Sequence, residues 1–181
     1  MRIISGSHKG KTIFPGKYFN SRPTTDTAKE GLFNILNNYF DFETIGILDL
    51  FSGTGCISYE FASRGCTNIT SVELSYKNAE FIKTTAKELK FEGFKSIKGN
   101  AFQFLKNSLV SYDIIFADPP YDMADIETIP DFVFQNNRLS ENGWLIIEHS
   151  SKNNFSSHPN FHEKRNYGKV NFSIFKNIVN N

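Results

Sequence analysis

The sequence has few of the residues that build metal centres and disulfide frameworks. Its 181 residues include only two cysteines, Cys56 and Cys66, and four histidines. The histidines are scattered along the chain, without the spacing of metal ligands, at His8, His149, His158 and His162. Two cysteines need not pair in a reducing compartment. We therefore expect no metal site and two small, buried thiol side chains.

Long hydrophobic runs are also missing. No apolar stretch approaches the roughly 18 residues that a membrane span needs. Charged residues and glycine interrupt residues 1–11 before an apolar stretch of signal-peptide length develops. Hydrophobic residues make up 39% of the chain and charged residues 22%, which is typical of a globular protein in water. These features predict a cytoplasmic protein without a membrane partner, folded as one domain over residues 1–181.

The net charge of +1 hides an uneven distribution. Residues 1–22 carry five basic residues and no acid, whereas residues 41–148 carry sixteen acids and nine bases. From residue 149 onward, five Lys or Arg residues stand against one acid. The basic arm over residues 1–22 can contact a polyanion, or it can be a solvated basic face. The charge pattern leaves both interpretations open.

Short apolar runs alternate with helical patterns through the middle of the chain. Residues 2–5 and 11–14 suit a small hairpin, and residues 23–40 contain a helix capped by Thr24 or Thr25. Strand patterns cover residues 45–51, 68–74, 95–99, 112–118 and 143–149, and helical patterns cover residues 56–64, 75–93, 100–108 and 124–137. Two extended segments joined at Gly168 then predict an antiparallel hairpin. The pattern predicts a doubly wound α/β core over residues 45–176 with an antiparallel end, in which ligands bind beyond the carboxyl ends of the central strands.

A glycine-rich turn follows the first predicted strand of this core. Asp49 and Phe51 end the strand, and the turn consists of Ser52, Gly53, Thr54 and Gly55. A dinucleotide fingerprint would place glycine three residues after Gly55, where the chain has Ser58, and Asp49 would repel a pyrophosphate. A ligand that carries a positive charge suits this turn better. S-adenosylmethionine is such a ligand, because it has an ammonium group and a positive sulfur but no phosphate.

Acidic and amide side chains follow the next two strands. Glu73 and Leu74 end the second strand, twenty residues after Gly53, where a carboxylate can accept hydrogen bonds from both hydroxyls of a ribose. Alone, such a glutamate is more often a solvated edge residue. Asn100 and Ala101 follow the third strand, where an adenine amine would lie. Asn100 can equally be a helix cap, and both interpretations stay open.

The fourth strand ends in Asp118, Pro119, Pro120 and Tyr121. Prolines fix the backbone and donate no hydrogen bond, so the turn is rigid and its carbonyls are available. A planar amine can donate to the Asp118 carboxylate and to the Pro119 carbonyl, while Tyr121 offers a flat surface for a base removed from its stack. Holding such an amine beside a methyl donor would be the main source of catalysis. For an isolated proline turn, a structural role with the tyrosine in the core would be the better interpretation.

Together, these segments resemble one known family. "LDLFSGTG", "VE" and "DPPY", preceded by "MRIISGSHKGK" and "RPTTDTAKEGLFN", resemble the RsmD-type methyltransferases over nearly the whole chain. The resemblance implies the seven-stranded, Rossmann-like fold of S-adenosylmethionine-dependent methyltransferases. It also implies methylation of the exocyclic N2 of a guanine in 16S ribosomal RNA, at guanine 966. The partner would be ribosomal RNA or a small-subunit assembly particle, and we expect a monomer.

The same resemblance implies roles for further residues. Asp49, Ser52, Gly53, Gly55 and Glu73 would hold the cofactor, and the segment from Arg22 through Thr25 to Asp26 would lie over its methionine end or over the base. RNA phosphates would contact the basic arm, which contains Arg2, Lys9, Lys11, Lys17 and Arg22. At Asn100 the family usually has an acid, although an amide oxygen can still accept the adenine amine.

Three other functions compete with this one. The proline turn also occurs in amino-methyltransferases that act on adenine in DNA or RNA, or on a protein glutamine. A nucleic-acid-binding module could retain the fold without catalysis. A nicotinamide-dependent oxidoreductase is disfavoured by Asp49 and by the missing third glycine.

Overall fold

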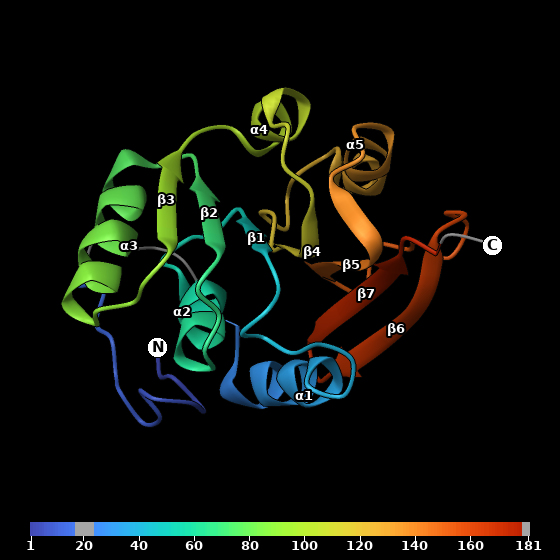
Figure 1. Cartoon of the computed structure of the whole chain (residues 1–181). Coiled ribbons are helices and arrows are strands. Elements are labelled where there is room, and N and C mark those ends of the chain that lie inside the picture. Colours follow the sequence, from blue (N-terminus) through green and yellow to red (C-terminus); the bar gives the residue numbers. More distant parts are fainter. Residues whose placement is uncertain (17–23, 179–181) are drawn as a thin grey trace.

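The computed structural model describes residues 1–16 and 24–178, and its centre is a seven-stranded sheet (Figure 1). The strands are β1 (Ile47–Leu50), β2 (Ile69–Glu73), β3 (Phe94–Lys98), β4 (Tyr112–Ala117), β5 (Leu139–His149), β6 (Phe161–Tyr167) and β7 (Val170–Lys176). Their spatial order is β3-β2-β1-β4-β5-β7-β6. The first five strands pair in parallel, and β7 joins β5 and β6 in antiparallel pairs. The doubly wound sheet with an antiparallel end is therefore confirmed.

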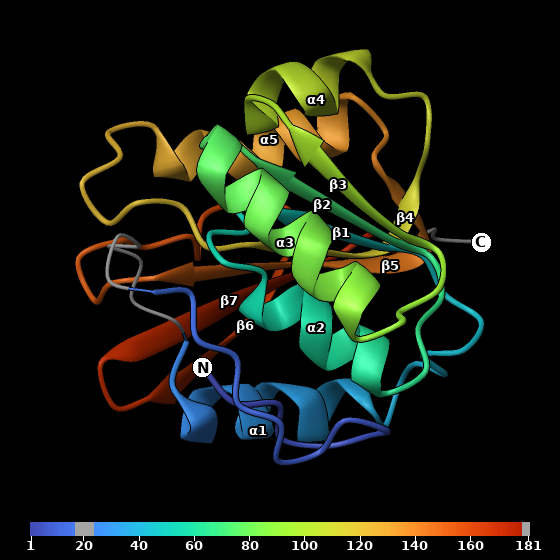
Figure 2. The same cartoon turned by 90° about the vertical axis from the view of Figure 1, so that its left-hand side faces the viewer.

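Helices cover both faces of this sheet. They are α1 (Asp26–Leu36), α2 (Cys56–Ser63), α3 (Tyr76–Glu88), α4 (Ala101–Asn107) and α5 (Ile129–Gln135), with a 3-10 turn, η1 (Ile126–Thr128), before α5. Figure 2 shows α4 and α5 on one side of the strands and α1 and α2 on the other. Helices α2, α3 and α5 each connect two neighbouring parallel strands, whereas α4 connects β3, at the edge of the sheet, to β4 on the other side of β1.

Alternating side chains of the buried strands fill two separate cores. Ile47 of β1 and Ile114 of β4 pack with α1 and α2, whereas Leu48 and Ile115, one residue later, pack with α4 and α5. This period of two is the geometry of a strand whose two faces are both covered. The sequence predicts residues 45–51 as a buried strand because this run is apolar, too short for a helix and bounded by glycine.

Side-chain caps begin three of the helices. Thr25 accepts a hydrogen bond from the Ala28 N–H of α1, Ser75 accepts one from Asn78 in α3, and Asn100 accepts one from Gln103 in α4. Such caps satisfy N–H groups that have no partner inside the helix. Pro130 stands in the first turn of α5, where proline is tolerated.

The N-terminal residues fold back as a small hairpin. Arg2 and Thr12 form an antiparallel bridge, and Ile3 and Ile13 are buried against α2 and α3. The predicted hairpin of residues 2–5 with 11–14 is present, but its strand pairing is a single bridge. Two basic residues of the predicted arm, Lys17 and Arg22, lie outside the described residues.

Most predicted elements agree with the structure, but β5 is longer than expected. It begins at Leu139 rather than at residue 143, and its polar first half pairs with β4 through an irregular register between Tyr112 and Ile114. That part lacks the apolar run on which the prediction rested. In the part of the chain that the structure describes, no helix is long and apolar enough to cross a membrane.

Candidate active site

The carboxyl ends of β1, β2 and β4 lie side by side. Leu50, the last residue of β1, pairs with Val72 of β2 on one side and with Ala117 of β4 on the other. Beyond the strands, the Asp118 N–H donates to the Leu50 carbonyl at 3.4 Å. The glycine turn and the proline turn therefore begin at neighbouring positions of one sheet edge, as the sequence predicted.

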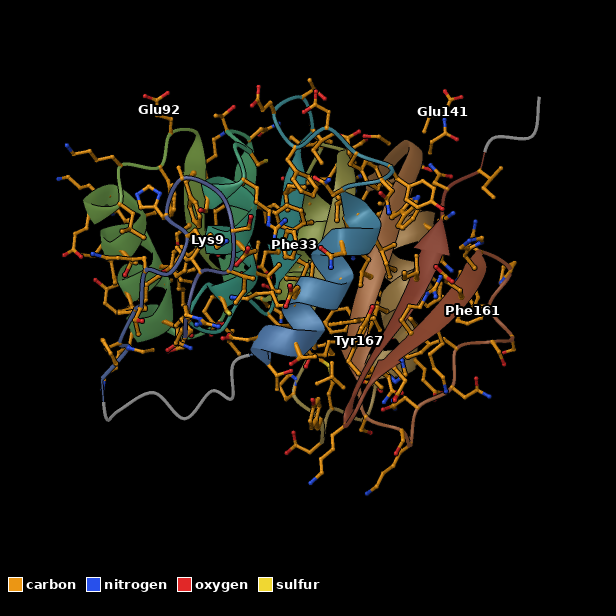
Figure 3. All side chains as sticks on the ribbon, turned by 90° about the horizontal axis from the view of Figure 1, so that it is seen from below. Lys9, Phe33, Glu92, Glu141, Phe161 and Tyr167 are labelled. Carbon is orange, nitrogen blue, oxygen red and sulfur yellow. The ribbon has the colours of Figure 1, made fainter. Side chains whose placement is uncertain are left out.

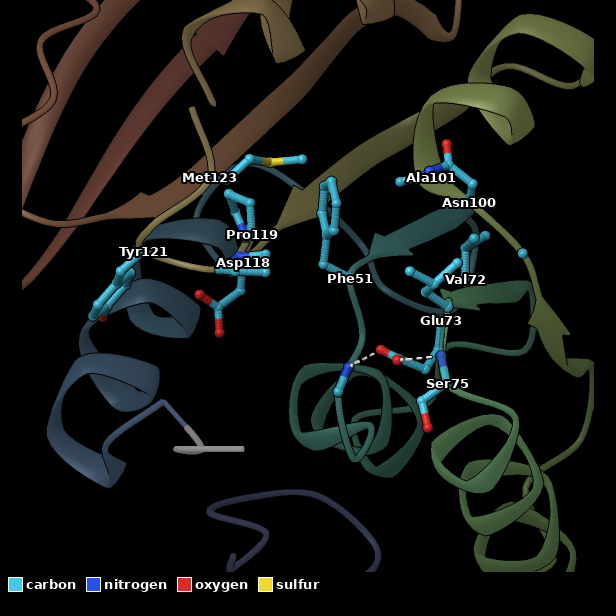
Figure 4. A pocket seen from close by; sticks show the side chains of 14 residues that line it. Phe51, Val72, Glu73, Ser75, Asn100, Ala101, Asp118, Pro119, Tyr121 and Met123 are labelled. Carbon is cyan, nitrogen blue, oxygen red and sulfur yellow. Dashed lines mark hydrogen bonds between the residues drawn. The ribbon is translucent and has the colours of Figure 1, made fainter. Parts of the chain in front are cut away.

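A cavity of about 710 Å³ opens at this edge (Figure 4). Its volume is typical of small-molecule sites. The last two residues of β2 and the residues that follow β1, β2, β3 and β4 line it: Phe51, Gly53, Val72, Glu73, Leu74, Ser75, Gly99, Asn100, Ala101, Asp118, Pro119, Pro120, Tyr121 and Met123. The structure thus brings the predicted ribose acceptor, the predicted adenine region and all four residues of the proline turn into one cavity.

Glu73 is held in a fixed position by backbone groups from two loops. One carboxylate oxygen accepts the Gly53 N–H at 2.8 Å, and the other accepts the Ser75 N–H at 2.8 Å. A carboxylate has about four lone-pair sites, so each oxygen can accept one more hydrogen bond. The side chain is therefore aligned to receive a pair of hydroxyl groups, such as those of a ribose, without rearrangement.

The turn after β1 has an unusual backbone. Phe51 has a φ of +58°, Gly53 of +55° and Gly55 of +85°. A left-handed φ at a phenylalanine is rare and is found most often at functional sites. Gly55 lines neither cavity of this region, and a Cβ there would lie 2.8 Å from the Tyr59 ring. Glycine at position 55 thus leaves room for the Tyr59 ring, which lies one turn further along in α2.

A small second cavity of about 30 Å³ adjoins the first beneath the same turn. Asp49, Ser52 and Thr54 line it, and Asp118 and Thr24 reach it as well. The Ser58 hydroxyl donates to the Asp49 carboxylate at 2.5 Å. Burial raises the pKa of Asp49 from 3.8 to about 7, because desolvation outweighs the hydrogen bonds from Ser58. A cation in either cavity would favour the charged form of Asp49.

The proline turn points its functional groups toward the cavity. Asp118 is half-buried, and burial together with the charges of Glu148 and Asp49 raises its pKa well above the usual value. The Pro120 carbonyl accepts the Met123 N–H at 2.9 Å, which closes the turn and leaves the Pro119 carbonyl as the candidate acceptor. Tyr121 is 55% exposed, so its ring is not part of the core. A flat ligand can reach it.

Glu148 is a functional candidate that the sequence analysis missed. It ends the apolar part of β5, only 3% of its surface is exposed, and it accepts hydrogen bonds from the Thr24 hydroxyl at 2.8 Å and the Tyr121 hydroxyl at 3.4 Å. The sequence contains the signal, because Glu148, like Asp49 and Glu73, is an acid near the carboxyl end of a predicted parallel strand. Burial raises the pKa of Glu148 as well.

The remaining predicted residues lie around these cavities. Asn100 lines the main cavity and also caps α4, so its two interpretations are compatible. Thr25 caps α1, and Asp26 forms an exposed ion pair with Arg2 at 2.9 Å. Lys9 and Lys11 are exposed on the hairpin, where Figure 3 shows Lys9 on the loop that passes below the sheet. Their predicted contacts with cofactor or RNA stay predictions.

The charges of the site fit a cationic ligand. Four neighbouring strands each contribute one acid near their carboxyl ends: Asp49, Glu73, Asp118 and Glu148. Among the described residues that line the two cavities, none is Lys, Arg or His. A phosphate would be repelled here, whereas an ammonium and a sulfonium would be stabilised. The apolar walls around Phe51, Val72 and Ala101 suit a purine ring, so the residues present fit S-adenosylmethionine.

Comparisons with known proteins show the family of this chain. The model of the family described as conserved hypothetical protein 95 matches residues 1–176. Ribosomal RNA small subunit methyltransferase D of Buchnera aphidicola subsp. Baizongia pistaciae is 32% identical, over 99% of this chain and 93% of its own. The protein of the same name from Escherichia coli is 25% identical, over 97% and 89% of the two chains.

Solved structures share the fold. Escherichia coli yhhF superposes with a TM-score of 0.87 over 99% of each chain, at 23% identity. An RNA methyltransferase from Salinibacter ruber, solved with S-adenosyl-L-homocysteine, gives a TM-score of 0.69 at 13% identity, over 88% of this chain and 95% of its own. With a family match over nearly its full length, this chain belongs to the conserved hypothetical protein 95 family, which is the RsmD family.

Proposed function

We propose that this protein transfers a methyl group from S-adenosyl-L-methionine to the exocyclic N2 amine of a guanine in small-subunit ribosomal RNA, at the RsmD-type position. One observation carries the proposal. The Glu73 carboxylate and the turn from Asp118 to Tyr121 line the same cavity, on neighbouring tips of β2, β1 and β4. A donor site and an acceptor site in one cavity are what group transfer requires.

The donor half of the cavity lies between β1 and β3. Glu73 would accept the ribose hydroxyls, Asn100 and Ala101 would border the adenine, and Asp49 would balance the positive charge of the methionine end. When bound, S-adenosylmethionine supplies a methyl group on a positively charged sulfur. The names of two relatives, both ribosomal RNA small subunit methyltransferase D, support this substrate class.

The proline turn, Asp118 to Tyr121, forms the wall of the cavity where the acceptor base would bind. A guanine amine is a weak nucleophile, because its lone pair is delocalised into the ring. Asp118 would accept one N–H and the Pro119 carbonyl the other, so that the nitrogen faces the donor. A raised pKa makes Asp118 a better acceptor for the proton that the amine releases, as long as the carboxylate is ionised beforehand. Tyr121 would stack on the base after it has left its helix.

The basic hairpin would hold the RNA around the flipped base. Lys9 and Lys11 are exposed on this hairpin and Arg2 lies at its base, beside Asp26. Contacts with phosphates would come from these residues and from Lys17 and Arg22. Such contacts position a nucleic acid without reading its sequence.

The test uses small-subunit particles, and separately free 16S RNA, from cells that lack this methyl group. Purified protein and isotope-labelled donor are added, and the RNA is digested and analysed by mass. We expect labelled N2-methylguanosine with the native protein and none with Asp118→Ala. Label in an adenine, in protein, or nowhere would refute the proposed acceptor.

A further inference from the structure

We propose that Glu148 is a positioning residue for the transfer reaction, which holds Tyr121 and the segment before α1 in place at the acceptor side of the cavity. This inference rests on the proposed function, because it concerns the same pocket. It goes beyond that function by assigning a role to a residue of β5, a strand that contributes no residue to the lining of either cavity among the described residues.

Strand register places Glu148 beside Asp118. Ala117 of β4 pairs with Ile147 of β5, and these two strands are parallel. The residue that follows each member of this pair is an acid: Asp118 comes directly after β4, and Glu148 is in β5. The two carboxyl groups therefore stand at neighbouring strand ends. Glu148 is buried there. Glu141, near the start of the same strand, is exposed and is labelled at the upper right of Figure 3.

The Glu148 carboxylate joins two segments that are distant in sequence. One oxygen accepts the hydroxyl of Thr24, from the segment just before α1, and the other accepts the hydroxyl of Tyr121, from the proline turn. The separations along the chain are 124 and 27 residues. Tyr121 has an exposed ring and a hydroxyl tied to a buried group, which fixes one end of the ring while its face stays accessible.

The charge of Glu148 acts on the same site. The carboxylate of Glu148 faces two ionisable groups, Asp118 at the end of β4 and the phenol of Tyr121, while Thr24 is neutral. Asp118 in turn is influenced by Asp49 of β1. His149, the next residue of β5, bonds to Ser173 and Ser150 instead, and burial lowers its pKa. Glu148 therefore contributes a negative charge that raises the pKa of Asp118.

Two substitutions separate the hydrogen bonds from the charge. Glu148→Gln removes the charge but keeps both hydrogen bonds, because a hydroxyl can donate to the amide oxygen or accept from the amide nitrogen. Glu148→Ala removes both bonds. Glu141→Gln, in the same strand but exposed, is the matched control.

We expect Glu148→Ala to lower kcat/KM for RNA by about 10- to 100-fold, mostly in kcat, because a misplaced acceptor site loses alignment. Glu148→Gln should stay within about threefold of the native value at pH 8, which is the size of a modest positional change. Its activity should also persist to lower pH than that of the native protein, because Asp118 then ionises at lower pH. Glu141→Gln should match the native protein in every measurement.

The inference is overturned if both Glu148 variants lose the same activity and Glu148→Gln leaves the pH profile unmoved. Should Glu148→Ala fail to fold, the pH profile of Glu148→Gln still decides the question. If Glu148→Ala folds, a double-mutant cycle of Glu148→Ala with Tyr121→Phe is measured by urea unfolding, and an absence of coupling in that cycle also overturns the inference. Native protein that methylates no RNA refutes the proposed function alone, since the unfolding cycle needs no substrate.

Discussion

Removing the charge of Glu60 should destabilise this protein more than any exposed charge change. Glu60 of α2 is fully buried and forms an ion pair with Lys29 of α1 at 3.3 Å, and Lys29 is 1% exposed. Its carboxylate also accepts the backbone N–H groups of Ile4 at 2.8 Å and Ser5 at 3.0 Å. Arg64 binds it from the same helix at 2.9 Å. One carboxylate therefore connects the hairpin, α1 and α2.

The magnitude follows from what Glu60→Gln leaves behind. A glutamine has one acceptor oxygen, so one of the two hairpin N–H groups would face the amide nitrogen instead. Lys29 would keep the Arg2 carbonyl and the Cys56 sulfur at 3.6 Å as partners, without any neutralising charge from Glu60. Breaking a buried ion pair on one side costs about 3–5 kcal/mol. For a chain of this size, that corresponds to a Tm lowered by roughly 6–20 °C.

The assay is urea unfolding of the native protein and three variants. Glu60→Gln should lose about 3–5 kcal/mol. Lys29→Met should lose less, because Glu60 retains Arg64 and two backbone donors. Glu80→Gln is the control, since Glu80 pairs with Lys83 at 3.8 Å on the exposed surface of α3, where an ion pair contributes at most about 1 kcal/mol.

Amide exchange gives a second measurement on the Glu60→Gln protein. We expect faster exchange at Ile4 and Ser5, because those amides lose their acceptor. A loss under about 1 kcal/mol for Glu60→Gln would refute the reasoning, as would a larger loss for Lys29→Met than for Glu60→Gln.

Three further predictions test the site and its turn. Glu73→Gln should weaken S-adenosylmethionine binding by about 10- to 100-fold in calorimetry, because the amide nitrogen is a donor and accepts neither a backbone N–H nor a ribose hydroxyl; unchanged affinity would contradict the assignment. Folding raises the pKa of Asp49 from 3.8 to about 7. Below about pH 4 the group is protonated in both the folded and the unfolded chain and does not affect stability. Between about pH 4 and pH 7 only the unfolded chain ionises it, so the ligand-free protein loses stability as the pH rises. The Tm of Asp49→Asn should therefore match the native Tm near pH 4 and exceed it by several degrees at pH 8, and a difference independent of pH would refute this. Gly55→Ala should lower the free energy of unfolding by about 2–4 kcal/mol, and the control Gly168→Ala by roughly 1–2 kcal/mol. Both glycines have positive φ, but of the two only a Cβ at position 55 would meet other atoms. Equal losses would show that the contact with Tyr59 adds nothing to the cost.

The sheet could be predicted from the sequence because β1, β4 and the second half of β5 are short, mainly apolar runs. That pattern fixes the strand type and, with the intervening helices, the parallel topology. The same pattern concealed Glu148. It stands near the end of the strand pattern "GWLIIEH", where it is a strand-end acid like Asp49 and Glu73.

The ion pair of Lys29 and Glu60 could not be predicted in this way. Charged residues in amphipathic helices usually face water, and nothing local in either helix indicates that both charges are buried. Their burial arises because the hairpin covers α2, which is a contact between residues more than 50 positions apart. Sequence periodicity carries no information about such a contact.

The hairpin is thus connected, through α2, to the edge of the sheet that carries the glycine turn. Glu60 lies one turn into α2, and the same helix supplies Ser58 to Asp49. A shift of α2 would move the hairpin that is expected to hold RNA and, at the same time, the hydroxyl that holds Asp49. If RNA binding moves the hairpin, RNA should change the affinity of the native protein for S-adenosylmethionine. Glu60→Gln should make this change in affinity smaller. Equal coupling in both proteins would mean that the hairpin and the donor cavity act independently.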